Sequence, residues 1–238
     1  MKYEQFLEEL NKLPVDVTEE KLSKLNKYFE TLVEYNEKVN LTTITSQEDV
    51  LLKHFYDSLT PTKIYDFNQV KSLIDVGTGA GFPGVVLKIF FPNIKLTLLD
   101  SNNKKIKFLE HLTKILNLKN VEFKCERSEE YAKTNFEKYD LVIARAVKSL
   151  DILFELCLPL VTKNGYFISM KGNLDQELDE NIKVIEYFGC CLKEKLNFTL
   201  PDGSNRSLIL VLKNNDAKVI LPREYSQIVK KPLKNRVK

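Results

Sequence analysis

The chain has 238 residues, of which 43% are hydrophobic and 29% charged, and its formal net charge is +3. This composition is typical of a folded globular protein, and no apolar run approaches the roughly 20 residues that cross a membrane. The four cysteines form no C-x-x-C pair and there are only two histidines, so we expect reduced thiols, no metal site and a cytoplasmic protein.

Residues 1–69 are predicted to form an N-terminal helical extension. Tyr3 begins a short apolar stripe that ends before Pro14, and Thr18 can cap a long second helix. Ser46 and Asp49 have the spacing of a capping box ahead of a third helix, which stops at Pro61.

Residues 70–215 are predicted to form an α/β domain. The sequence alternates between strands and helices, which favours a parallel sheet covered on both faces. The strands are expected at 72–76, 94–99, 120–125, 139–144 and 165–170, and the helices at 83–91, 102–117, 128–135 and 149–161. After a helix near 175–188, strands at 193–200 and 206–213 flank a turn and predict an antiparallel hairpin.

The segment LIDVGTGAGFPG (73–84) and the Asp100 that ends IKLTLLD predict a nucleoside cofactor site. Glycines permit the tight turn, and a carboxylate at the tip of the second strand can accept both ribose hydroxyls. The loop also satisfies G-x-G-x-x-G, so an NAD-linked oxidoreductase is formally allowed. Asp75, which can orient the loop or meet a methionine amine, and bulky Phe82, which crowds a pyrophosphate, favour S-adenosylmethionine instead.

Ligands of open parallel sheets bind beyond the carboxyl ends of the strands. On that basis the cofactor-binding candidates are Asp75, Gly77, Gly79, Phe82, Asp100, Ser101, Asn102, Ser128, Glu129 and Arg145. Ser128 and Glu129 are expected to read the adenine edge. Arg145 and Lys171 end the fourth and fifth strands, where cations would repel a sulfonium and therefore suit an anionic partner such as RNA. A salt bridge at a strand end remains the alternative for both, and for Arg127.

The last segment, 216–238, is basic: from Arg223 onward it holds six basic residues and one acid. Such a tail can contact phosphates, although a solvated terminus explains the charge equally well.

The chain resembles the RsmG (GidB) family of bacterial 16S ribosomal RNA methyltransferases, which methylate N7 of a guanine. The resemblance covers nearly the whole chain and rests on VNLTTI (39–44), KHFYDSL (53–59), LIDVGTGAGFPG (73–84), DSNNKKIKFL (100–109), ARAVKSL (144–150) and MKG (170–172). It implies a Rossmann-like S-adenosylmethionine-dependent methyltransferase sheet with the helical extension added. Lys53 stands where the family usually has arginine, and Ser226 and Ile228 replace a usual glycine and proline.

The resemblance also implies roles for single residues. Arg145 would contact the cofactor or the target guanine, while His54 and Asp57 would line the guanine pocket, and these three are the catalytic candidates. The RNA-binding candidates are Lys53, Arg127, Lys171, Arg223, Lys230 and Lys231. The expected partner is 16S ribosomal RNA, within the small subunit rather than naked, and a monomer is favoured. A non-catalytic ribosome-assembly factor and a small-molecule methyltransferase remain as alternatives.

Overall fold

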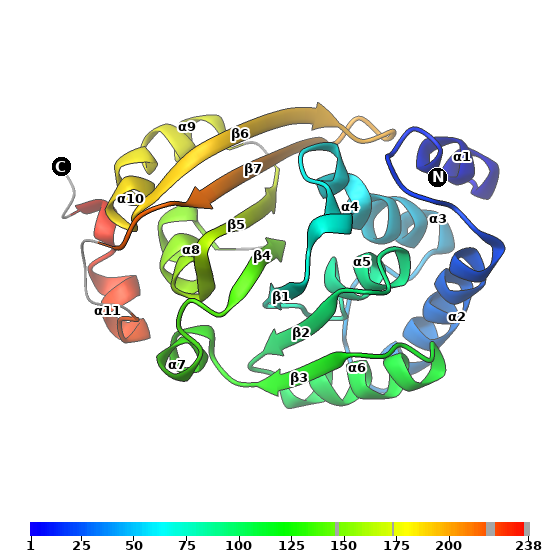
Figure 1. Cartoon of the computed structure of the whole chain (residues 1–238). Coiled ribbons are helices and arrows are strands. Elements are labelled where there is room, and N and C mark those ends of the chain that lie inside the picture. The colour runs from blue at the N-terminus through cyan, green and yellow to red at the C-terminus, as the bar shows by residue number, and fades with distance from the viewer. Residues whose placement is uncertain (146–147, 173, 218–221, 236–238) are drawn as a thin grey trace.

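A computed structural model describes residues 1–145, 148–172, 174–217 and 222–235, without the side chains of residues 175 and 176. Its centre is a seven-stranded sheet of order β3-β2-β1-β4-β5-β7-β6 (Figure 1). The strands are β1 (Ser72–Val76), β2 (Lys95–Asp100), β3 (Val121–Cys125), β4 (Tyr139–Arg145), β5 (Val161–Lys171), β6 (Cys190–Thr199) and β7 (Asn205–Lys213). The first five pair in parallel and the last two form the antiparallel hairpin. The predicted α/β, Rossmann-like fold is confirmed.

Helices cover both faces of the sheet (Figure 1). One face packs against α5 (Gly84–Phe90) and α6 (Asn103–Ile115), together with the N-terminal helices. The other packs against α7 (Ser128–Thr134), α8 (Leu150–Cys157) and α10 (Ile182–Tyr187). The helix predicted near 175–188 is two helices, α9 (Asp175–Asp179) and α10. Pro159 lies in a 3₁₀ turn, Leu158–Leu160, so the helix predicted over 149–161 ends early and β5 begins at Val161.

The N-terminal extension consists of α1 (Tyr3–Leu10), α2 (Glu19–Asn36) and a composite third helix. The predicted caps are present: the Thr18 hydroxyl accepts the Lys21 N–H at 3.3 Å, and the Ser46 hydroxyl accepts the Asp49 N–H at 3.2 Å. The third helix was predicted as a regular α-helix. It instead runs from α3 (Gln47–Asp49) through a π-helical segment, Val50–Tyr56, into α4 (Asp57–Leu59), followed by 3₁₀ turns Thr60–Lys63 and Phe67–Gln69. π-Helical turns are often found at functional sites.

The C-terminal segment folds onto the sheet domain, and its helices were not predicted. It contains α11 (Tyr225–Lys230) and a 3₁₀ turn, Leu233–Asn235. Ile228 and Leu233 are fully buried, and both elements contact α8. Among the described residues of this segment, the basic ones, Arg223, Lys230, Lys231 and Lys234, therefore belong to a packed structure.

Strand order positions the site. The chain leaves β1 for β2 and β3 on one side and returns to β4 and β5 on the other, so the order reverses between β1 and β4. Crevices at such reversal points, beyond the carboxyl ends of the strands, are where ligands bind in open α/β sheets. Among the helices of the described ranges, none has the length and apolar character needed to span a bilayer.

Candidate functional site

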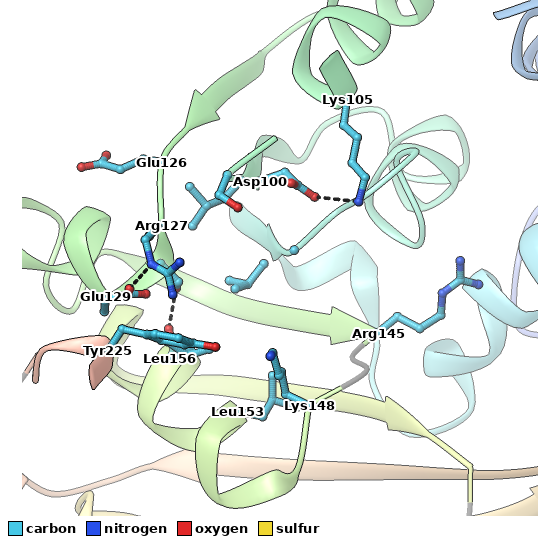
Figure 2. A pocket seen from close by; sticks show the side chains of 15 residues that line it. Asp100, Lys105, Glu126, Arg127, Glu129, Arg145, Lys148, Leu153, Leu156 and Tyr225 are labelled. Atoms are coloured by element: carbon cyan, nitrogen blue, oxygen red, sulfur yellow. Dashed lines mark hydrogen bonds and ion pairs between the residues drawn. The ribbon is translucent and has the colours of Figure 1, made fainter. Parts of the chain in front are cut away.

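A pocket of about 420 Å³ lies at the carboxyl ends of four parallel strands (Figure 2). Gly77 follows β1, Asp100 and Ser101 end β2, residues 126–129 follow β3, and Arg145 ends β4. The wall is completed by Val76, Leu99, Lys105, Lys148, Leu153, Leu156 and Tyr225. Its size is within the range of small-molecule sites, and its position is the one predicted for the cofactor.

The glycine loop is held by Asp75. The buried Asp75 carboxylate accepts the Thr78 hydroxyl at 2.7 Å and the Gly84 N–H at 2.8 Å, both through Oδ2. Gly84 must be glycine because an added Cβ would lie 2.7 Å from that same oxygen. Burial raises the pKa of Asp75 to about 6. These two contacts orient the loop, and Asp75 is not among the residues that line the pocket; a contact with the methionine amine stays a prediction.

Asp100 lies in the pocket wall at the tip of β2, as predicted. Its Oδ2 accepts the Gly79 N–H at 3.0 Å and its Oδ1 accepts the Asn102 N–H at 2.9 Å. The Lys105 ammonium lies 3.7 Å away. A carboxylate has about four acceptor positions, so both oxygens can still accept hydroxyl groups. Asn102 caps α6, where its Oδ1 accepts the Lys104 N–H, and neither Asn102 nor Gly79 lines the pocket.

The end of β3 brings Arg127, Ser128 and Glu129 to the pocket. The Ser128 hydroxyl donates to the Leu156 carbonyl at 2.6 Å, so it is already engaged with α8. The Arg127 Nε forms a short ion pair with the buried Glu129, and the guanidinium lies 3.9 Å from the ring centroid of Tyr225. Arg127 was considered as an RNA contact or a strand-end salt bridge, and the structure shows the salt bridge inside the pocket.

Phe82 was predicted to contact the cofactor, but it lies outside the pocket wall. It is buried in an aromatic stack, 5.1 Å from the Tyr28 ring and 4.2 Å from the His54 ring between centroids. The Tyr28 hydroxyl donates to the Ala80 carbonyl at 2.5 Å. Phe82 therefore attaches the helical extension to the glycine loop, since its apolar ring gains more from packing than from facing a polar ligand.

Arg145 connects the pocket to the helical extension. Its Nη1 donates to the Lys53 carbonyl at 2.9 Å and lies 3.4 Å from Asp57 Oδ2. Asp57 also accepts a hydrogen bond from Arg206 Nε, at 2.9 Å through Oδ1. One buried carboxylate is thus shared by two guanidinium groups. We call Arg145, Asp57 and Arg206 the arginine cluster.

Arg206 was missed by the sequence analysis because it belongs to no recognisable motif. Arg206 pairs with Phe198 in the β6–β7 hairpin, far from the glycine loop in the sequence. This pairing places Arg206 beside Asp57. The turn at 201–205 predicted the hairpin but not which side chain would face the helical extension.

His54 is buried against Phe82 in the π-helical segment. Its Nδ1 lies 3.2 Å from the Lys53 carbonyl and its Nε2 lies 3.1 Å from the Thr42 hydroxyl. These contacts favour the neutral tautomer in which Nδ1–H donates to the carbonyl and Nε2 accepts from Thr42, so Arg145 Nη2 at 3.4 Å is a packing contact. Burial, aided by nearby Arg145, lowers the pKa of His54 to about 3.

The remaining RNA-binding candidates divide into paired and exposed cations. Lys53 pairs with Asp49 at 2.7 Å and Lys171 with Glu177 at 2.6 Å. Lys230 and Lys231 are exposed.

The placement of Arg223 among the RNA-binding candidates assumed a surface residue, and the structure buries it. It is 7% exposed and forms a two-pronged ion pair with Glu155, Nε to Oε2 and Nη2 to Oε1, both at 2.7 Å. Glu155 engages two of the three guanidinium nitrogens, and the third, Nη1, is buried without a hydrogen-bond partner among the described residues, so Arg223 anchors the C-terminal segment from the interior.

Comparison with known proteins identifies the family. Residues 21–208 match the family model GidB, described as rRNA small subunit methyltransferase G. The chain belongs to this family. It is 44% identical to ribosomal RNA small subunit methyltransferase G of Macrococcus caseolyticus. The aligned region has 232 residues and covers 96% of this chain and 98% of that protein. Its identity to the protein of that name from Oceanobacillus iheyensis is 45%, covering 98% of this chain and all of the other.

A solved structure, M. jannaschii TYW2 in complex with AdoMet, resembles this chain in fold. The TM-score is 0.51 at 13% identity, over 63% of this chain and 70% of that one. The family match confirms the RsmG (GidB) resemblance drawn from the sequence motifs.

Proposed function

We propose that this chain transfers a methyl group from S-adenosylmethionine to N7 of a guanine in 16S ribosomal RNA. The observation that carries the proposal is the position of Arg145, which lines the pocket and also belongs to the arginine cluster. A nucleoside pocket and a surplus of positive charge therefore meet at one side chain. Family membership supplies the substrate class.

The pocket residues fit S-adenosylmethionine by their chemistry. Asp100 offers acceptor positions for the ribose hydroxyls, beside Ser101. Gly77 has φ +71° and no atom would contact an added Cβ within 4 Å, so the open space beside this glycine is available to a ligand. Because the Ser128 hydroxyl is engaged by Leu156, we assign reading of the adenine edge to the backbone near Ser128 and Glu129.

The reaction requires positioning more than proton transfer. S-adenosylmethionine supplies an electrophilic methyl group when bound, and guanine N7 has a lone pair and no proton to lose. The neighbouring groups agree with this requirement: His54 is neutral and buried, and Asp57 is bound by two arginines, so neither is poised as a base. Holding the two reactants in line can lower a barrier by several kcal/mol.

The arginine cluster provides the contact with RNA in this proposal. Two guanidinium groups and one carboxylate leave a net positive charge, and each arginine side chain is about one fifth exposed. Arg145 would contact the guanine or the cofactor, with His54 and Asp57 holding it in place. Lys53, Lys171, Lys230 and Lys231 remain candidates for weaker phosphate contacts. The assembled small subunit, a monomeric enzyme and a cytoplasmic location complete the proposal.

Transfer of radiolabelled methyl from S-adenosylmethionine to small ribosomal subunits that lack this modification tests the function directly. We expect label in 7-methylguanosine after nucleoside digestion, and its loss in Asp100→Ala but not in the exposed-acid control Asp179→Ala. Cofactor binding without transfer to subunits or naked RNA would favour a ribosome-assembly factor. Transfer only to small acceptors would favour a small-molecule methyltransferase.

A further inference from the structure

Tyr225 lines the cofactor pocket although it belongs to the C-terminal segment (Figure 2). The Arg127 guanidinium lies over its ring, 3.9 Å from the centroid, and the Lys148 ammonium lies 6.0 Å from the same centroid. Arg127 is fixed from a second direction by its ion pair with Glu129. An aromatic ring and a guanidinium plane are thus stacked in the wall, at the end of the pocket formed by β3.

Buried hydrogen bonds hold the segment that carries Tyr225 against α8. Two residues earlier, Arg223 forms its buried pair with Glu155 of α8, and its Nη2 also donates to the Lys231 carbonyl at 3.1 Å. The Leu233 N–H donates to Glu155 at 3.0 Å. The two ends of α11 are therefore tied to one buried carboxylate.

A second contact fixes the segment laterally. Glu224, next to Tyr225, pairs with Lys133 of α7 at 2.7 Å. Because α7 begins directly after Arg127, the helix that follows β3 and the segment that carries Tyr225 are held together. The position of the ring is consequently set by packing on α8 and by an ion pair to α7.

Both members of the stack are groups on which nucleobases pack. Aromatic rings and arginine planes each stack on bases, and an alanine substitution of such an aromatic weakens binding roughly 5- to 150-fold per base in nucleic-acid complexes. They stand beside Ser128 and Glu129, the residues assigned to the adenine edge.

We propose that the C-terminal segment completes the cofactor site, with Tyr225 and the Arg127 stacked on it forming the wall against which the adenine packs. This inference rests on the proposed function, since it takes the ligand to be S-adenosylmethionine. It gives the basic segment a second role: its buried contacts place an aromatic residue in the pocket. Arg127 and Tyr225 thereby become cofactor-site residues.

Calorimetric binding of S-adenosylmethionine to the full chain tests the inference. Tyr225→Ala is expected to weaken binding about tenfold, within the range for loss of one stacking partner. Tyr225→Phe keeps the ring and is expected to bind within about twofold of wild type. Tyr3→Ala removes an exposed tyrosine from α1 and is the matched control, with unchanged affinity. Free adenosine, used as a competitor, should lose affinity for Tyr225→Ala by the same factor as the whole cofactor.

The outcomes separate this inference from the proposed function. If wild-type protein binds S-adenosylmethionine and Tyr225→Ala, melting at the wild-type temperature, binds it equally well, the inference is overturned and the proposed function stands. A Tyr225→Ala variant that loses affinity for small-subunit RNA but not for the cofactor would also overturn it, in favour of an RNA-contacting tail. Wild-type protein without affinity for S-adenosylmethionine would refute the proposed function itself, and the inference with it.

Discussion

Asp57 and Glu155 are both buried carboxylates that bind arginine, and they do so differently. Asp57, in the helical extension, is shared by Arg145 and Arg206, whose side chains are 21% and 23% exposed. Glu155, in α8, holds the single Arg223, whose side chain is 6% exposed, with both of its oxygens. The first set keeps one positive charge in excess at the edge of the cofactor pocket. The second set matches one carboxylate with one guanidinium, and both side chains are shielded from solvent.

The difference separates cations that can act on a partner from cations that hold the fold. In the matched pair the remaining donor nitrogen, Arg223 Nη1, is buried away from solvent, and removing the arginine would leave a carboxylate buried alone. A surplus guanidinium that reaches solvent can bind phosphate or a base carbonyl. In the sequence Arg145 and Arg223 have the same chemistry; they differ in how many arginines share the carboxylate and in how far each side chain is exposed.

The largest effect is expected for stability at the matched pair. Arg223→Ala should lower the free energy of unfolding by about 3–5 kcal/mol, because Glu155 would stay buried without its partner. Urea denaturation measures the change, with exposed Lys230→Ala as a control expected within about 0.5 kcal/mol of wild type. The double variant Glu155→Leu/Arg223→Leu should recover part of the loss. A loss below about 1 kcal/mol in the single variant would mean that Glu155 is not desolvated as described.

The next largest effect is expected for activity at the shared carboxylate. Arg145→Ala should lower kcat/KM about 100-fold, which is the order found when one donor is removed from a reacting centre. The fold should survive, because Arg206 still pairs with Asp57. Arg145→Lys should not restore the rate, since an ammonium lacks the planar fork. Methyl transfer to small subunits under single-turnover conditions gives the rate, and activity within threefold of wild type would remove Arg145 from the reaction.

A smaller effect is expected from His54 on the pH dependence of stability. Its pKa falls from 6.5 to about 3 on folding, so below pH 6.5 the unfolded chain takes up a proton that the folded chain does not. Stability therefore decreases as the pH falls from 6.5 toward 3. Between pH 7 and pH 5 wild type should lose about 2 kcal/mol more than His54→Gln.

Denaturation of both proteins at the two pH values measures this difference. Asp75, whose raised pKa acts in the opposite direction, is present in both and cancels. Equal losses in wild type and His54→Gln would show that His54 titrates normally and is not buried as described.

The sequence predicted the elements whose signals are local. The glycine loop, the acid at the tip of β2, the alternation of strands and helices, and the Thr18 and Ser46 caps depend on residues close together in the chain, and the structure confirms each of them. The position of Asp100 in the pocket wall could be predicted because parallel strands bring their carboxyl ends to one edge of the sheet.

What the sequence could not provide depends on partners far away in the chain. Phe82 is bulky in a glycine loop, which suggested a ligand contact, yet its neighbours are Tyr28 and His54 from the helical extension. Tyr225 and Arg206 reach their sites through packing of α11 on α8 and through hairpin register. The π-helical segment is another such case, because the pattern of apolar residues does not distinguish it from an α-helix.

The smallest effect is expected at Lys171, which sharpens the comparison between matched and surplus cations. Its ammonium pairs with Glu177 at 2.6 Å, and its side chain is only 15% exposed. Lys171→Ala should change the affinity for small-subunit RNA by less than about threefold and leave the salt dependence as in wild type, because a paired cation neutralises no additional phosphate. Arg206→Ala is the contrasting variant: it removes a surplus charge, and the slope of log K against log salt should fall by about 1. Filter binding at several salt concentrations measures both. A larger slope change for Lys171→Ala than for Arg206→Ala would reverse the distinction, and would mean that RNA displaces Glu177 from Lys171 while the arginine cluster serves the protein alone.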